Sequence, residues 1–159
     1  SPAGRADAAA VARSEAEALA PILAARKVSL ALDLPAQAIA EPADADQIGQ
    51  VMRNLLDNAI RHGRQGGEVR LSVARATERD GRHGVTIIVT DDGHGIPREH
   101  IPRLTERFYR VDKGRSRNAG GTGLGLAIVK HIVNRHRGTL GIESEEGVGT
   151  TFRVWLPGA

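Results

Sequence analysis

Two periods of hydrophobic and polar residues run along this chain, and they separate expected helices from expected strands. Apolar side chains recur every three or four residues in segments 6–26, 44–62 and 124–137, which predicts three helices. Apolar side chains that alternate with other residues predict half-buried strands. These strands are expected over residues 28–35, 69–73, 85–89, 140–142 and 152–156.

Proline and glycine mark where these elements are expected to break or turn. Pro21 should kink the first helix or begin a second segment, and Gly138 is a candidate cap for the last helix. Asp80-Gly81 and Glu146-Gly147 are typical of hairpin turns. A short helix is expected at 98–104 and a long irregular loop at 105–123. The apolar stripe of the first helix is predicted to consist of Val11, Leu19, Ile22 and Leu23.

The order of the elements predicts an α/β fold, with one mixed sheet and helices packed on one face. A length of 159 residues suits one domain. The chain has no cysteine, which excludes disulfides and thiolate metal sites and favours a reducing compartment, so we expect a cytoplasmic location. No apolar run approaches the roughly 20 residues of a membrane span, although a parent protein anchored in the inner membrane stays open.

The formal net charge is +3, and basic residues are densest between Arg103 and Arg117. This stretch is interpreted as a solvated loop or as a loop that faces phosphates. A nucleic-acid patch has the least support, because the other arginines are scattered along the chain. No nucleic-acid partner is therefore expected.

The second long helix places polar side chains on a stripe beside its apolar face. Asn54, Asn58 and Arg61 share this stripe, with His62 nearby, over a rise of roughly 10 Å that matches the reach of a triphosphate with its metal. An amide oxygen is a suitable ligand for Mg²⁺. A solvated helix face is the alternative interpretation, although two asparagines four residues apart are unusual in mid-helix.

Two glycine-rich turns lie on either side of the basic stretch. The first, 91–97, follows a predicted strand, so its glycines would let a flat ligand approach while Asp91 accepts a hydrogen bond from an exocyclic amino group of adenine. An ordinary Asp- and Gly-rich turn is the alternative. The second turn, 121–125, opens a helix whose free N–H groups suit phosphates. It is neither a dinucleotide fingerprint nor a P-loop.

Five segments stand in an order and spacing that belong to a known family. They are Asn-Leu-Leu-Asp-Asn-Ala at 54–59, Asp-Asp-Gly-His-Gly-Ile-Pro at 91–97, Glu-Arg-Phe-Tyr-Arg-Val-Asp at 106–112, Gly-Thr-Gly-Leu-Gly-Leu-Ala-Ile at 121–128 and Gly-Val-Gly-Thr-Thr-Phe at 147–152. They closely resemble the N, G1, F, G2 and G3 boxes of the catalytic, ATP-binding domain of bacterial two-component sensor histidine kinases, in the GHKL superfamily. The resemblance covers nearly the whole chain, and five ordered boxes are specific.

The resemblance implies a two-layer α/β sandwich of the GHKL ATPase type that holds Mg-ATP under a mobile lid. Asp91 would bind the adenine amino group, and Asn58 would hold Mg²⁺ with Asn54 beside it. Arg61 and Arg110 would act on the phosphates as catalytic residues. The remaining nucleotide-binding positions implied are His62, Gly93, Gly95, Ile96, Gly121, Thr122, Gly123, Leu124, Gly125, Leu126 and Thr150.

Two positions depart from the family pattern. His62 stands where tyrosine is common, and Thr105 stands where the first phenylalanine of the F box is often found. Neither position changes the Mg-ATP assignment, whereas Thr105 would loosen the packing of the lid.

The family's phosphoacceptor pattern, His-Glu/Asp-x-x-Thr/Asn, does not begin at any of the six histidines. The chain, residues 1–159, therefore resembles the ATP-binding half without its substrate half. The implied partners are its own dimerisation and histidine-phosphotransfer domain and the receiver domain of a response regulator. The fragment would be a monomer and the parent protein a homodimer.

Two other functions remain as alternatives. A non-catalytic module would bind ATP or ADP without transferring phosphate, although the intact boxes favour an enzyme. A GHKL serine kinase or gyrase-like ATPase would keep the fold and change the acceptor. The long loop argues against the serine kinase, and a gyrase-like ATPase would have a glutamate base where this chain has Asn54.

Overall fold

The computed structural model describes residues 1–78, 80–111 and 124–159 of the chain. Its helices are α1 (Ala8–Ala18), α2 (Ala20–Arg26), α3 (Ala45–His62), the 3-10 helix η1 (Arg98–Arg103) and α5 (Gly125–Arg135). Its strands are β1 (Ala6–Asp7), β2 (Ser29–Asp33), β3 (Ile39–Ala40), β4 (Glu68–Thr77), β5 (His83–Asp91), β6 (Thr139–Glu145) and β7 (Gly149–Pro157). Among the described residues, no helix has the length and apolar character needed to cross a membrane.

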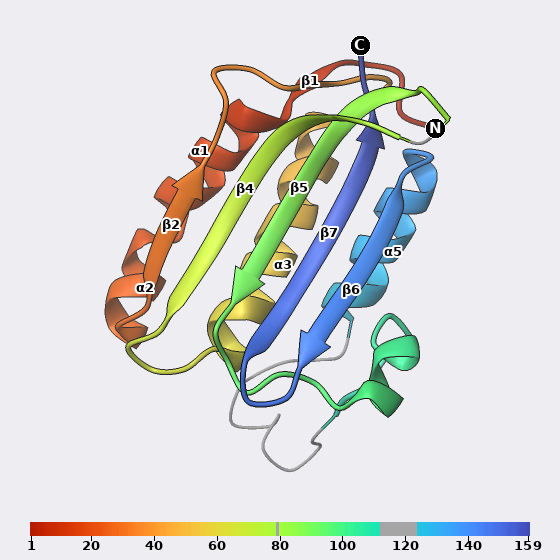
Figure 1. Cartoon of the computed structure of the whole chain (residues 1–159). Helices are drawn as coiled ribbons and strands as arrows, with labels where there is room; N and C mark the ends of the chain where they lie inside the picture. Colours follow the sequence, from red (N-terminus) through yellow and green to blue (C-terminus); the bar gives the residue numbers. More distant parts are fainter. Residues whose placement is uncertain (79, 112–123) are drawn as a thin grey trace.

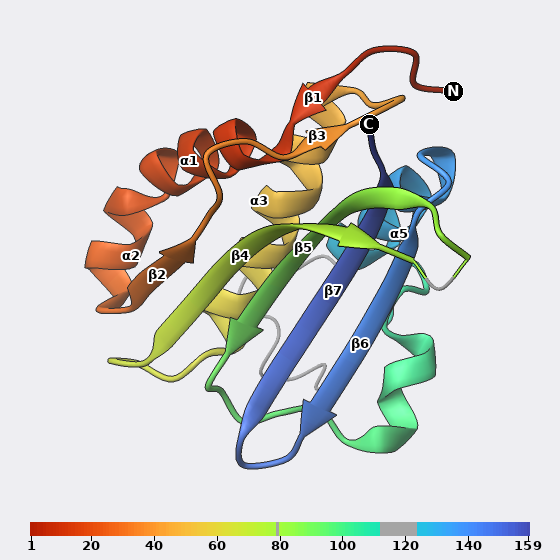
Figure 2. The same ribbon diagram turned by 45° about the horizontal axis from the view of Figure 1, so that its top comes forward.

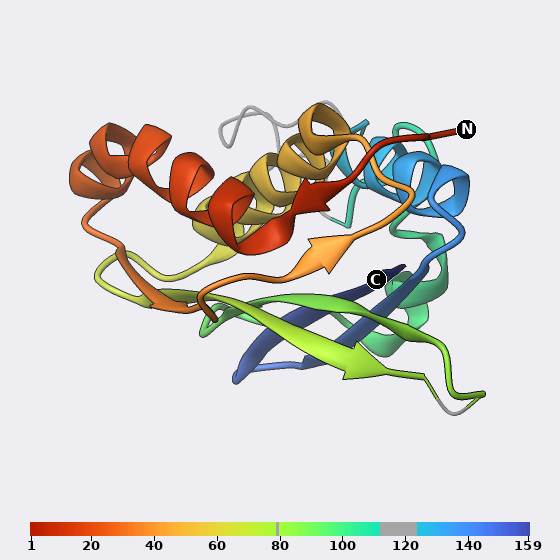
Figure 3. The same cartoon turned by 90° about the horizontal axis from the view of Figure 1, so that it is seen from above.

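Five strands form one mixed sheet in the order β2-β4-β5-β7-β6. Strand β2 runs parallel to β4, and the other neighbours are antiparallel. Helices α1, α3 and α5 lie together on one face of this sheet, here called the inner face (Figures 1 and 3). A small antiparallel pair, β1 with β3, lies near both chain termini (Figure 2). The expected α/β sandwich with helices on one face is confirmed.

The core lies between the inner face and α3. Neighbouring strands align their apolar residues in register, so that Val89 pairs with Phe152 and Ile87 with Val154, all of them fully buried. Helix α3 adds its own apolar stripe, and truncating one such large core side chain typically costs about 2–5 kcal/mol. The buried apolar residues of α3 are Ile48, Val51, Met52, Leu55, Leu56, Ala59 and Ile60.

The sequence of α3 sets where the helix begins and ends. The Asp44 side chain caps it by accepting a hydrogen bond from the Gln47 N–H at 3.1 Å, and the helix ends at His62 before Gly63. The buried imidazole of His136, after α5, accepts the Asp44 N–H at 3.1 Å through Nε2. The start of α3 is thereby tied to the end of α5, and the polar stripe of α3 extends toward the opposite end of the sheet.

The first predicted helix divides into two. One of the two outcomes expected at Pro21, a second helical segment, is confirmed, because α2 begins at Ala20 with Pro21 in its first turn. The predicted apolar stripe is confirmed at three of its four residues, because Leu19 is buried and Val11 and Leu23 pack partly buried against the core. It fails at Ile22, and the prediction did not include the buried alanines. Ile22 is 45% exposed, whereas Ala8, Ala9 and Ala12 are fully buried. Alanine side chains let α1 lie close to its neighbours, so the smallest residues of the helix form its packed face.

Gly138 takes part in the cap of α5, as expected, but it is not the left-handed residue. Arg137 takes the left-handed conformation after α5, with φ of 59°, and the Gly138 N–H donates back to the Val133 carbonyl at 2.9 Å. A Cβ at position 138 would lie 2.2 Å from the Trp155 carbonyl oxygen. Glycine is therefore required at 138 by a close approach of backbone to β7.

The other turns follow the predictions. The β4–β5 hairpin turns at Asp80-Gly81, the β6–β7 hairpin turns at Glu146-Gly147, and η1 forms the short helix before the loop. Strand β2 is shorter than expected, because it ends at Asp33. Residues 112–123 of the predicted irregular loop and lid lie outside the described residues.

Candidate nucleotide-binding site

Three polar side chains continue the apolar rows of the inner face at one end of the sheet. Asp91 of β5 pairs with Thr150 of β7, which pairs with Ser144 of β6. Each of these residues lies two positions from an apolar residue of the inner face on its own strand, Val89, Phe152 and Ile142 respectively, so they occupy the same face. Asp91 and Thr150 are each only 6% exposed. The core thus ends in a row of polar groups, here called the polar row (Asp91, Thr150 and Ser144).

The Asp91 carboxylate is partly satisfied within the protein. Its Oδ1 accepts the Gly93 N–H at 2.8 Å. Burial is the main cause that raises the pKa of Asp91, the Asp92 charge raises it further, and the Gly93 and Thr150 backbone N–H groups act in the opposite direction. A buried carboxylate with remaining acceptor capacity is stabilised by a ligand that donates a hydrogen bond.

Gly93 and Gly95 hold the turn after β5 against the rest of the site. A Cβ at Gly93 would lie 2.3 Å from the His62 carbonyl oxygen, and a Cβ at Gly95, whose φ is +77°, would lie 2.3 Å from the Glu145 carbonyl oxygen. Only glycine fits these approaches, so the turn is pressed between the end of α3 and β6. From the sequence, we expected these glycines to let a flat ligand approach the backbone. The structure shows that they also allow close contact of the turn with His62 and Glu145.

The polar stripe of α3 faces the start of α5. The Asn54 side-chain Nδ2 donates to the Gly125 carbonyl oxygen at 3.2 Å. Asn58 is half-buried one turn further along, and Arg61 pairs with Asp57 at 3.0 Å. In Figure 1 the end of α3, the end of β5 and the start of α5 all lie at the bottom of the sheet. The polar stripe of α3 therefore lies at the same end of the sheet as the turn after β5 and the start of α5.

His62 is exposed at the end of α3, although neighbouring atoms surround much of its imidazole. The resulting desolvation is the main cause that lowers the pKa of His62, and the Arg61 charge lowers it further. The ring consequently favours the neutral form. A neutral imidazole can accept as well as donate a hydrogen bond.

The structure describes the residues on either side of the predicted lid, up to 111 and from 124 onward. Leu124, Gly125 and Leu126 form the start of α5, whereas Gly121, Thr122 and Gly123 lie outside the described residues. Before the gap, Arg110 is half-buried. The preceding segment is held to η1, where the Tyr109 hydroxyl is hydrogen-bonded to His100 and the Arg103 guanidinium lies 4.4 Å from the centre of the Tyr109 ring.

Three residues that no sequence pattern singled out hold this end of the molecule together. Ser144 accepts the Ile96 N–H at 2.7 Å, Asp92 accepts the Glu68 N–H at 3.1 Å, and Arg64 donates to the Gly147 carbonyl oxygen at 3.0 Å. Ser144 could have been found, because it continues the alternation of Leu140 and Ile142. Nothing in the pattern distinguishes Asp92 or Arg64 from other surface charges.

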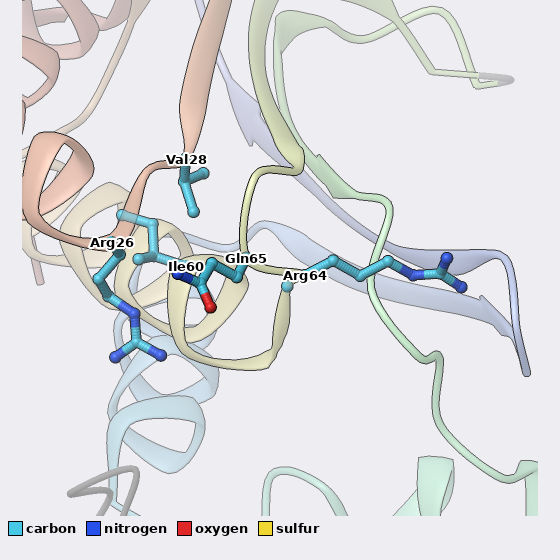
Figure 4. Close-up of a pocket in the computed structure, with 6 residues that line it drawn as sticks. Arg26, Val28, Ile60, Arg64 and Gln65 are labelled. Atoms are coloured by element: carbon cyan, nitrogen blue, oxygen red, sulfur yellow. The ribbon is translucent and has the colours of Figure 1, made fainter.

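The cavity in Figure 4, of about 230 Å³, lies beside the C-terminal end of α3 but does not include the polar row. In Figure 4 the Arg26 side chain points downward, and the Arg64 side chain extends to the right, away from the other labelled residues. A second cavity of about 480 Å³ includes Thr77 and His83, at the far end of β4 and β5. Neither cavity is lined by any predicted nucleotide-binding residue, so the candidate site is assigned from the polar row and the three motifs.

The sequence profile of the histidine kinase-, DNA gyrase B- and HSP90-like ATPase family matches residues 43–159. The chain belongs to this family. Membership in an ATPase family implies an ATP site. The structure brings the end of β5 with Asp91, the C-terminal end of α3 and the start of α5 to the same end of the sheet (Figure 1).

Sequence relatives of this family member are sensor kinases. The sensor histidine kinase WalK of Bacillus subtilis is 42% identical over 125 residues, which cover 79% of this chain and 20% of the relative. The phosphate regulon sensor protein PhoR of Pseudomonas aeruginosa is 42% identical over 140 residues, which cover 88% of this chain and 30% of the relative. The chain thus spans a fifth to a third of the length of these curated relatives.

Solved structures agree with the sequence relatives. The mycobacterial sensor histidine kinase MprB superimposes with a TM-score of 0.78 at 28% identity and covers 98% of this chain and 97% of its own. Full-length ShkA in complex with AMPPNP gives a TM-score of 0.78 at 26% identity, covering 99% of this chain and 32% of its own. The resemblance to the catalytic domain of sensor histidine kinases, and the GHKL-type fold, are confirmed.

Proposed function

We propose that residues 1–159 form the catalytic, ATP-binding domain of a two-component sensor histidine kinase. The domain binds Mg-ATP and donates the γ-phosphoryl group to a histidine on a separate dimerisation domain, for relay to the receiver domain of a response regulator. The observation that supports this most is the buried Asp91 carboxylate, which lies beside Thr150 where α3 and α5 converge. The absence of cysteine fits a reducing compartment, so the proposal places the domain in the cytoplasm.

The polar row fits the six-amino edge of adenine. Asp91 retains acceptor capacity after bonding Gly93, and its burial makes a donor on the ligand favourable. The turn 93–96 is fixed by backbone contacts to α3 and β6, so it can form a rigid wall for the purine ring. Gly93, Gly95 and Ile96 are proposed to form this wall.

The polar stripe of α3 and the start of α5 fit the phosphates. The hydrogen bond from Asn54 to Gly125 holds the N-terminus of α5, with its free N–H groups and positive dipole end, toward that stripe. The Asn58 amide oxygen is a hard ligand of the kind that Mg²⁺ takes alongside phosphate oxygens. Arg61, His62 and Arg110 complete the proposed phosphate side, together with residues 121–126.

Bound Mg²⁺ would neutralise charge on the phosphate oxygens. Arg61 and Arg110 are proposed to stabilise the charge that develops as the acceptor imidazole nitrogen bonds to the γ-phosphorus and the bond to the ADP oxygen breaks. Asn54 stands where a general base would activate water, and its amide cannot take up a proton near neutral pH. The site therefore favours an acceptor that brings its own nucleophile.

Labelling with γ-labelled ATP tests this proposal. The chain alone is expected to acquire no label and to hydrolyse ATP at a negligible rate, whereas an added cognate dimerisation domain is expected to acquire acid-labile phosphate. Asn58→Ala should abolish that transfer. Multiple turnovers per second by the chain alone, lost in Asn58→Ala, would instead identify an ATPase, and ATP binding without transfer would identify a non-catalytic module.

A further inference from the structure

The Ser144 hydroxyl connects the turn after β5 with the start of β7. It lies 2.7 Å from the Ile96 N–H, 3.1 Å from the Gly149 carbonyl oxygen and 2.8 Å from the Thr150 hydroxyl oxygen. Ser144 lies on the edge strand β6, and Thr150 separates it from Asp91 in the register of the sheet. It therefore contacts the groups proposed to face the purine without being adjacent to Asp91.

Donor and acceptor roles in this group follow from counting protons. The Ile96 N–H can only donate and the Gly149 carbonyl can only accept, so Ser144 accepts from the first and donates its single proton to the second. The remaining contact is then a hydrogen bond from the Thr150 hydroxyl to Ser144. This arrangement makes three hydrogen bonds, whereas donation from Ser144 to Thr150 would leave only two.

The assignment fixes what Thr150 presents to its surroundings. Its hydroxyl proton is used by Ser144, so only lone pairs remain for another partner. Asp91, its neighbour on the inner face, also presents lone pairs when ionised. Both buried groups of the polar row therefore accept hydrogen bonds and do not donate them.

We propose that Ser144 is a positioning residue for base selection, which sets the polarity of the Thr150 hydroxyl so that the site takes six-amino purines and rejects six-keto purines. The proposal rests on the proposed ATP-binding function. An amino group at position six offers protons to acceptors, whereas a keto oxygen there would face lone pairs and leave them unpaired. Leaving buried polar groups unpaired is a strong source of discrimination.

Calorimetric titration of ATP and ITP tests the inference, because ITP carries the six-keto group without the additional amino group of GTP. The parent chain is expected to prefer ATP. In Ser144→Ala the Thr150 hydroxyl is free to turn and donate, so the ratio of the two affinities should fall about tenfold, the size of one neutral hydrogen bond. Ser144→Thr keeps the hydroxyl and should keep the ratio.

Thr151→Ala is the matched control, because it removes a hydroxyl on the opposite face of β7 that lies 3.3 Å from Thr90. It should leave the ratio unchanged. The ratio does not depend on the fraction of folded protein, so loss of stability in a variant does not imitate the effect. An unchanged ratio in Ser144→Ala, or an equal fall in Thr151→Ala, overturns the inference while ATP binding persists. A parent chain that binds neither nucleotide overturns the proposed function as well.

Discussion

Asp91→Asn is expected to weaken ATP binding by roughly 10- to 150-fold, which corresponds to the loss of about 1.5–3 kcal/mol from one charge-assisted hydrogen bond. Asparagine has the same shape and can still accept the Gly93 N–H, so the turn should keep its position. Its amide offers one acceptor where the carboxylate offers two. Calorimetric titration measures the change, and Asp33→Asn, at the exposed end of β2, is the control.

The same variant should not destabilise the nucleotide-free protein at pH 7. Burial raises the pKa of Asp91 in the folded state, so the folded protein holds this proton more tightly than the unfolded chain. The stability that Asp91 contributes is therefore present below its unfolded pKa and lost as the pH rises through the folded pKa. Asparagine carries no charge to bury, so any advantage of the variant at pH 7 should disappear in acid.

Thermal unfolding at several pH values measures this second effect. A variant that binds ATP as tightly as the parent would contradict the assignment of Asp91 to the purine. A variant that is clearly less stable than the parent at pH 7 would show that the charged carboxylate stabilises the fold, contrary to the direction of its pKa shift.

Gly93→Ala is expected to damage both the fold and the site. The new methyl group would lie 2.3 Å from the His62 carbonyl oxygen and 2.9 Å from Asp91 Oδ1, so the backbone must move. Overpacking of this kind costs about 1–3 kcal/mol of stability. The shift would also displace the N–H that orients Asp91, and ATP affinity should fall at least about tenfold.

Gly141→Ala is the matched control, because a methyl group there would lie an ordinary 3.9 Å from the Arg153 carbonyl oxygen. It should be neutral or slightly stabilising. Denaturant unfolding and nucleotide titration of both variants check the prediction. Equal stability and equal ATP affinity of the two variants would show that the turn is not pressed against α3.

The sequence predicted the parts of the site that strong patterns define. The three-and-four spacing of α3 places Asn58 correctly, and the alternation of β5 places Asp91 at its end, because each pattern belongs to a well-buried segment. Thr150 lies on β7 but before the strand expected at 152–156, so only the family resemblance pointed to it. Whether these elements converge at one end of the sheet depends on strand order. Periodicity does not contain that information, so the family resemblance supplied it.

The errors have physical causes. The packed face of α1 consists of alanines, whose burial a hydrophobic stripe does not reveal. Gly138 takes part in the cap of α5, but its lack of a side chain serves contact with the distant residue Trp155. Ser144 is polar, so the apolar alternation of its strand ends at Ile142 and does not include it. In each case the decisive contact is tertiary.

The most direct test of the account locates the nucleotide on the molecule by NMR, through amide shift changes on titration with Mg-AMPPNP. We expect the changes to concentrate at residues 54–62, 91–96, 124–126 and 150, where the polar row meets α3 and α5. The Figure 4 cavity and the Thr77–His83 end of the sheet provide internal comparisons. Changes centred on Val28 and Gln65, or on Thr77 and His83, with none at Asp91 and Thr150, would contradict the account.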